Sequence, residues 1–87
     1  MSTWRRNPET RFRVVAGEGV VLRQRAAEVL VLNEVGARIV TLIEAGRSEH
    51  EIAATLASEF DVAAAEALRD VSAFADELVQ AGVLVPT

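Results

Sequence analysis

The sequence predicts an α+β domain in which a three-stranded antiparallel sheet is followed by three helices, in a winged helix-turn-helix-like arrangement. Three observations favour this fold. Short runs rich in β-branched residues fill the first third of the 87-residue chain. Residues typical of helix caps then begin two amphipathic segments, and glycines follow the ends of two helices. A chain of this length is enough for one hydrophobic core, and thus for one domain.

The sheet is predicted from three short segments with turn residues between them. Residues 11–16 alternate well enough for a first strand, residues 17–19 (Gly-Glu-Gly) form a turn, and residues 20–23 form a second strand. Residues 24–27 turn the chain again, although they contain neither glycine nor proline. Residues 28–32 then form the third strand. Such short connections indicate an antiparallel meander with the third strand at one edge.

The third strand, Glu28–Leu32, is unusual because it is apolar on both faces. A strand with one face on a core should alternate apolar and polar residues, whereas this one has four apolar residues in a row. It also lacks the features that usually protect a sheet edge, so we expect it to pair with a strand of another chain. Either Val29 and Val31 or Leu30 and Leu32 face the helices, and the sequence leaves this register open.

Three helices are predicted after the sheet. Asn33 is a good cap for the first, which Gly46 ends, and Ser48 begins the second with a capping box. The third helix is expected over residues 62–81, with Gly82 after its end. The positions expected to form its core stripe are Ala64, Leu68, Val71, Ala75 and Leu78.

Composition and the N-terminal residues limit the possible classes of protein. Residues 1–10 are polar and contain Pro8, so we expect a flexible arm before a domain over residues 11–87. Trp4 is the exception in this arm, and we expect it to fold back on the core. The chain has no cysteine for disulfides or thiolate metal sites. It has no signal-peptide or membrane-spanning run, which predicts a cytoplasmic protein with no membrane partner.

The sequence offers no set of residues suited to catalysis. The single histidine, His50, lies among acidic residues at the polar start of a helix, with no cysteine or second histidine to complete a metal site. The Glu49/Glu51 and Asp76/Glu77 pairs are interpreted as solvated faces. The sequence therefore predicts a protein that is not an enzyme and that needs no metal or cofactor.

Two functions other than pairing of the third strand with a strand of another protein are compatible with this fold. The helical half suggests a winged-helix DNA-binding regulator, but the third helix carries four carboxylates and one arginine, which duplex DNA would repel. The net charge of −4 also argues against a nucleic-acid partner. The second alternative is a structural dimerisation domain that pairs Glu28–Leu32 with its own copy.

Two motifs stand out in the sequence, the L-N-E-x-G turn and the D-V-x-x-F-x-x-x-L-x-x-x-G-x-L helix end. Through these motifs, and over about residues 12–85, the sequence resembles the PqqD family, which is known from pyrroloquinoline quinone biosynthesis. Two positions depart from the family pattern, because Val35 is commonly Thr and Ala75 is commonly a larger apolar residue. The matching positions are Leu32, Asn33, Glu34, Val35, Gly36, Ile39, Gly46, Glu51, Ile52, Leu56, Asp70, Val71, Phe74, Leu78, Gly82 and Leu84.

The resemblance implies a RiPP recognition element, that is, a domain that binds the leader of a ribosomally synthesised and post-translationally modified peptide. Such domains capture the leader segment of a precursor peptide as an extra strand, in a groove shared with the third helix. They then present it to a modifying enzyme such as a radical SAM enzyme, a protease or a cyclase. A helical wheel centred on Val71 selects the helix positions on one flank of the core stripe. The candidate peptide-binding residues are Glu28, Val29, Leu30, Val31, Leu32, Ala67, Asp70, Phe74 and Glu77.

Overall fold

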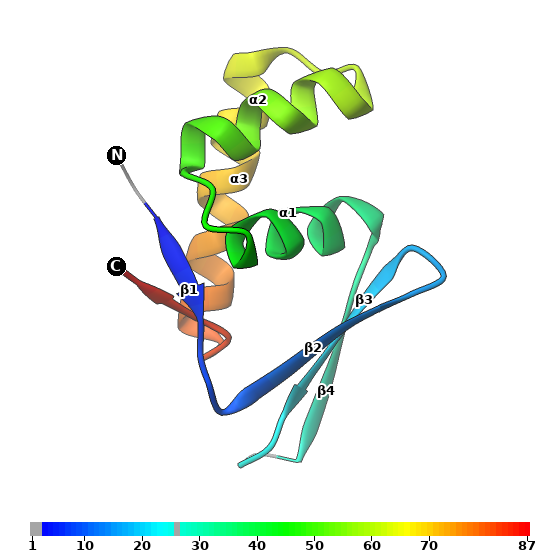
Figure 1. The fold of residues 1–87 in the computed structure, drawn as a ribbon, viewed down its shortest axis with the longest axis vertical. Coiled ribbons are helices and arrows are strands. Elements are labelled where there is room, and N and C mark those ends of the chain that lie inside the picture. Colours follow the sequence, from blue (N-terminus) through cyan, green and yellow to red (C-terminus); the bar gives the residue numbers. More distant parts are fainter. Residues whose placement is uncertain (1–2, 26) are drawn as a thin grey trace.

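The computed structural model describes residues 3–25 and 27–87, and it confirms a three-stranded antiparallel sheet joined to three helices (Figure 1). Within these residues, none of the helices combines the length and the apolar character needed to cross a bilayer. The elements in chain order are β1 (Trp4–Arg6), β2 (Thr10–Val15), β3 (Glu18–Arg23), β4 (Glu28–Leu32), α1 (Glu34–Glu44), α2 (Glu49–Phe60), α3 (Ala64–Gln80) and β5 (Leu84–Pro86).

The main sheet has the strand order β2-β3-β4, as the predicted meander requires. Its first hairpin turns tightly through Ala16 and Gly17, whose φ angles are 51° and 82°. Two successive positive φ angles are typical of a type I′ turn, which matches the twist of the flanking strands. Because this turn needs only two residues, Val15 pairs directly with Glu18. The second strand therefore begins two residues earlier than the sequence predicted.

The N-terminal segment differs from the flexible arm that was expected over residues 1–10. Residues 1 and 2 lie outside the described part of the chain, but Trp4–Arg6 form β1, which pairs antiparallel with β5. Trp4 is only 9% exposed and packs into the core, which confirms that it folds back. Burial of this large aromatic side chain favours order in a segment whose polar sequence alone predicts none.

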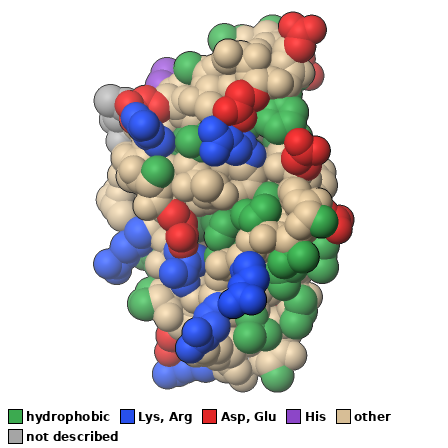
Figure 2. Space-filling model, turned by 45° about the vertical axis from the view of Figure 1, so that its right-hand side comes forward, with side chains coloured by type: hydrophobic (Ala, Val, Ile, Leu, Met, Phe, Trp, Pro, Cys, Tyr) green, Lys and Arg blue, Asp and Glu red, His purple; other side chains and the backbone are tan. Residues whose placement is uncertain are grey.

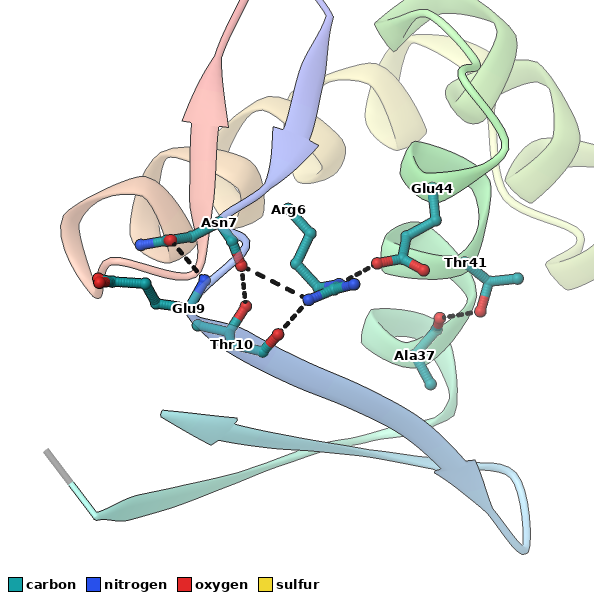
Figure 3. Close-up of polar contacts among 7 residues, drawn as sticks. All are labelled: Arg6, Asn7, Glu9, Thr10, Ala37, Thr41 and Glu44. Atoms are coloured by element: carbon teal, nitrogen blue, oxygen red, sulfur yellow. Dashed lines mark hydrogen bonds and ion pairs between the residues drawn. The ribbon is translucent and has the colours of Figure 1, made fainter. Parts of the chain in front are cut away.

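Arg6 connects this N-terminal strand to the rest of the molecule (Figure 3). Its guanidinium group donates to the backbone carbonyl of Thr10 at the start of β2 and forms an ion pair with Glu44 of α1. Asn7 continues the connection, because its side-chain amide donates to the carbonyl of Gly82 over 2.9 Å. These contacts hold β1, the start of β2 and the turn after α3 together.

The helix ends agree with the capping residues identified in the sequence. The Asn33 side chain accepts a hydrogen bond from the Gly36 amide over 2.9 Å at the start of α1. Ser48 and Glu51 form the predicted capping box, with their reciprocal bonds at 3.3 and 2.9 Å. Gly46 and Gly82 follow α1 and α3 with φ angles of 81° and 80°. Left-handed residues at these positions explain why glycine ends both helices.

The core lies between the helices and one face of the sheet. Val71, Ala75 and Leu78 of α3 are buried as predicted, whereas Ala64 is exposed and Leu68 is half-buried. Ala67 takes the place of these two residues, at 2% exposure. The buried stripe therefore follows positions 67, 71, 75 and 78, because α3 begins only at Ala64 and its first turn leaves Ala64 in solvent.

The capping box predicts one pH effect on stability. Hydrogen bonds from the backbone N–H of Ser48 and then from its side chain, with a smaller contribution from Arg47, lower the pKa of the Glu51 carboxyl group. A lowered folded-state pKa stabilises the fold above the ordinary glutamate pKa of about 4.3, and this contribution disappears as the pH falls through the folded-state value. We expect the Glu51→Gln variant to keep the cap but lose less stability than wild type between pH 5 and pH 3, which urea unfolding followed by circular dichroism measures. Parallel curves for the two proteins would contradict this expectation.

Candidate functional site

Strand β4 lies at the edge of the main sheet, where it has β3 on one side and no strand of the described chain on the other. Its side chains divide clearly between the two faces. Leu32 is 8% exposed and Leu30 packs against the core, whereas Val29 and Val31 are 57% and 65% exposed. The structure thus resolves the register that the sequence left open, with the leucines facing inward and the valines facing outward.

The hydrogen-bonding pattern of the sheet identifies the backbone groups at this edge. In a two-residue hairpin the residues flanking the turn, here Val15 and Glu18, form a hydrogen-bonded pair, and hydrogen-bonded and non-hydrogen-bonded pairs then alternate. Every second pair counted from Val15 and Glu18 should be hydrogen-bonded, and Glu9 and Gln24 would form such a pair just beyond the open end of the hairpin. The Gln24 amide does donate to the Glu9 carbonyl, which agrees with this pattern. By this alternation, the backbone N–H and C=O groups of Val21 in β3 point away from β2 and toward β4. Leu30 lies opposite Val21, so the N–H and C=O groups of Leu30 point toward β3. Those of Val29 and Val31 consequently point to the open side.

The opposite edge of the sheet, along β2, is protected where β4 is not. Arg11 and Arg13 are exposed on this strand, and charged side chains on an edge strand discourage pairing with another chain. Arg6 also occupies the backbone carbonyl of Thr10, as Figure 3 shows. Strand β4 has no comparable protection over its apolar residues, so its edge is the one more open to pairing with another strand.

A groove of about 270 Å³ lies beyond the C-terminal end of β4, between the start of α1 and the middle of α3. Phe74 of α3 forms part of its floor and packs closely against Gly36 of α1. A Cβ atom at Gly36 would lie 2.8 Å from Cζ of Phe74, so glycine at this position allows the close approach. The residues that line the groove are Asn33, Val35, Gly36, Ile39, Asp70, Ala73, Phe74 and Glu77.

Three of the four α3 candidates from the sequence meet in this groove. Asp70, Phe74 and Glu77 line it, but Ala67 does not, because it is 2% exposed and belongs to the core. Ala67 is therefore a core packing residue and not the surface residue that the sequence predicted. The helical wheel placed it on the flank because the predicted core stripe ran from Val71 back through Leu68 and Ala64, whereas the observed stripe runs back through Ala67.

The α1 wall of the groove was not predicted among the candidate residues. It consists of Asn33, Val35, Gly36 and Ile39, of which Val35 is 37% exposed. A signal was available in the sequence, since Val35 and Gly36 lie two and three residues after the helix cap Asn33, just beyond the strand that was expected to be open.

The electrostatics of the groove are acidic at its rim and apolar at its floor. Asp70 and Glu77 are both exposed, and no described arginine forms a salt bridge with either of them. Glu28, at the start of β4, differs because it forms an ion pair with Arg23. Such a surface suits an extended segment with apolar side chains and no carboxylate at this position.

Within the described residues, no three His, Cys, Asp or Glu side chains cluster in a way that could hold a metal ion. His50 is exposed on α2 and does not line the groove. What the arrangement offers is an open strand edge that leads into an apolar groove.

Comparison with known proteins agrees with this geometry. The family model of coenzyme PQQ synthesis protein D (PqqD) matches residues 18–84. None of the curated proteins matches the chain. One similar solved structure is a lasso peptide synthetase B1 complexed with the leader peptide, at 31% identity and a TM-score of 0.88, covering 95% of this chain and 98% of that one. Another is TbiB1 in complex with the TbiA(beta) leader peptide, at 25% identity and a TM-score of 0.86, covering 92% of this chain and 93% of that one. The chain therefore belongs to the PqqD family, as a PqqD-like RiPP recognition element.

Proposed function

We propose that this protein binds the leader segment of a ribosomally made precursor peptide as a fourth strand along β4. The observation that carries the proposal is the open edge at Val29 and Val31, which leads directly into the groove floored by Phe74. The similar solved structures hold leader peptides, which supports the same class of ligand here. Addition of a peptide strand to an exposed sheet edge is a common mode of recognition.

The geometry indicates which parts of the peptide matter. Backbone hydrogen bonds to Val29 and Val31 fix the peptide alongside β4 without reading its sequence. Alternate side chains of the peptide then face the helices, and those near Leu32 lie closest to the groove. Because the groove floor is apolar and its rim carries Asp70 and Glu77, we expect apolar anchors and no acidic residue at these peptide positions.

The free energies are sufficient for such binding. A micromolar dissociation constant requires about 8 kcal/mol net, and ordering a flexible peptide costs about 2–5 kcal/mol of the gross interaction. Burial of two or three large apolar side chains contributes roughly 1.5–3 kcal/mol each. Several backbone hydrogen bonds add about 1 kcal/mol each, so a groove of this size and one strand edge can supply the affinity.

The proposed role is that of an adapter which performs no chemistry itself. A modifying enzyme, such as a radical SAM enzyme, a protease or a cyclase, would act on the peptide while the leader is held. The benefit to the enzyme is a higher effective concentration of its substrate.

An NMR titration of the ¹⁵N-labelled chain with synthetic leader segments tests the proposal. We expect chemical-shift changes at Val29, Val31, Asp70 and Phe74, and much smaller changes on α2, because the peptide contacts β4 and the α1–α3 groove. A scrambled leader of equal composition is the control. Changes confined to α2, or equal binding of the scrambled peptide, would overturn the proposal. Edge-to-edge self-association seen by light scattering without peptide would favour a dimerisation domain instead.

A further inference from the structure

The face of the main sheet that points away from the helices forms a second surface, which we call the outer sheet face. The register places Leu22 opposite Val29 and Val20 opposite Val31, so that the apolar side chains of β3 and β4 lie side by side. Leu22, Val29 and Val31 are 38%, 57% and 65% exposed. A contiguous apolar patch of this kind on a small protein marks an interaction site. The outer sheet face consists of Arg11, Arg13, Val15, Glu18, Val20, Leu22, Val29 and Val31, with the single carboxylate, Glu18, at the hairpin end.

Arginine side chains border this apolar surface along β2. Arg11 lies opposite Leu22 and Arg13 lies opposite Val20. Within the described residues, no carboxylate forms a salt bridge with either arginine. A hollow of about 430 Å³ beside them is lined by Arg6, Arg11, Phe12, Arg13, Val15, Val20 and Leu22.

The distribution of charge along the chain makes these arginines distinctive. Residues 1–25 contain six arginines and two glutamates, although the whole chain has a net charge of −4. Figure 2 shows arginine side chains gathered next to exposed hydrophobic ones in the lower half of the molecule, with most carboxylates on that face in the upper half. A basic border on an apolar surface is complementary to a partner surface with an apolar centre and carboxylates along one side.

Other occupants fit this surface less well. A second copy that bound by the same face would bring four arginines but only two carboxylates, Glu18 of each copy, into one interface. A nucleic acid would gain nothing from the exposed valines and Leu22, and it would be repelled by the acidic helices. An apolar, acidic protein surface uses both features of the outer sheet face at once.

We propose that the outer sheet face docks a partner protein through an apolar surface bordered by carboxylates. The inference rests on the proposed function, because a leader strand beside β4 would extend this face with its own outward side chains. The partner would then contact the sheet and the peptide together. Reciprocal coupling requires that the peptide strengthen partner binding by the same factor that the partner strengthens peptide binding.

A designed helix serves as the probe for this surface. The experiment titrates the ¹⁵N-labelled full chain, with and without leader peptide, with an amphipathic helix that has leucines on one face and glutamates beside them. We expect shift changes at Arg11, Arg13, Leu22, Val29 and Val31. Exchange of the glutamates for lysines should weaken binding at least tenfold, and so should the Arg11→Glu/Arg13→Glu double variant. The Arg5→Glu/Arg69→Glu double variant, which changes two exposed arginines away from this face by the same total charge, is the matched control and should weaken binding less than twofold.

The outcomes separate this inference from the proposed function. Leader binding by the double variant should stay within twofold of wild type. If the leader binds normally but the acidic helix binds no better than the lysine helix, the docking inference fails alone. Tighter arginine-dependent binding of anionic phosphatidylglycerol vesicles or of duplex DNA at the same face would also overturn it. If wild type binds no leader at all, the proposed function fails, while the helix titration still decides the docking surface.

Discussion

The Val31→Pro variant is expected to lose leader binding by roughly 30- to 150-fold. Proline removes the backbone N–H that points to the open side of β4, and its ring occupies the space where a paired strand would lie. The lost hydrogen bond and the unpaired peptide carbonyl together cost about 2–3 kcal/mol, which corresponds to that range of affinity. Because the hydrogen bonds of Val31 do not run to β3, the fold itself should tolerate the change at this edge position.

The matched control for this prediction is Val31→Thr. Threonine keeps the β-branched shape and the backbone N–H, so its effect on leader affinity should be far smaller than that of proline. Isothermal titration calorimetry with the leader gives both affinities, and thermal unfolding checks that both variants fold. The prediction is wrong if the proline variant binds like wild type, or if threonine weakens binding as much as proline does.

The Phe74→Ala variant is expected to weaken leader binding by roughly 10- to 150-fold. Phe74 lies in the floor of the groove and contacts Gly36, so its loss removes the apolar surface against which a leader side chain packs. Burial of one large apolar side chain contributes about 1.5–3 kcal/mol, which sets the size of the effect. The loss should exceed that of any single arginine substitution, because no arginine lines the groove.

Two further variants separate binding from folding in this experiment. Phe74 is half-buried, so truncation to alanine should also lower the free energy of unfolding, by about 2 kcal/mol. Phe74→Leu keeps most of the packing and should recover most of the stability and part of the affinity. Arg69→Ala, on the same helix but outside the groove, should bind like wild type. Equal leader affinity of wild type and Phe74→Ala would contradict the proposed groove contact.

The parts of the fold that depend on local interactions could be predicted from the sequence. The caps at Asn33 and Ser48 and the glycines after α1 and α3 act within a few residues, and the structure has each of them in the expected place. The edge position of Glu28–Leu32 was also predictable, because short connections leave few other sheet orders.

The parts that depend on distant contacts could not be predicted in the same way. Four apolar residues in a row do not indicate which pair of side chains faces the core. The inward position of Leu30 and Leu32 is determined only when the sheet packs against the helices. Strand β1 is short and polar apart from Trp4, and its order depends on a partner strand near the other end of the chain. The α1 wall of the groove likewise exists only because Gly36 allows Phe74 to approach.

The pairing of β1 with β5 has a practical consequence for engineering. The Thr87 amide donates to the Thr3 carbonyl over 3.2 Å, so the two ends of the described chain leave the molecule side by side. Figure 1 places both ends away from β4. A fluorophore, an affinity tag or a host protein joined at either end would therefore emerge at one corner, and short linkers would suffice to insert the domain into a surface loop of a larger enzyme.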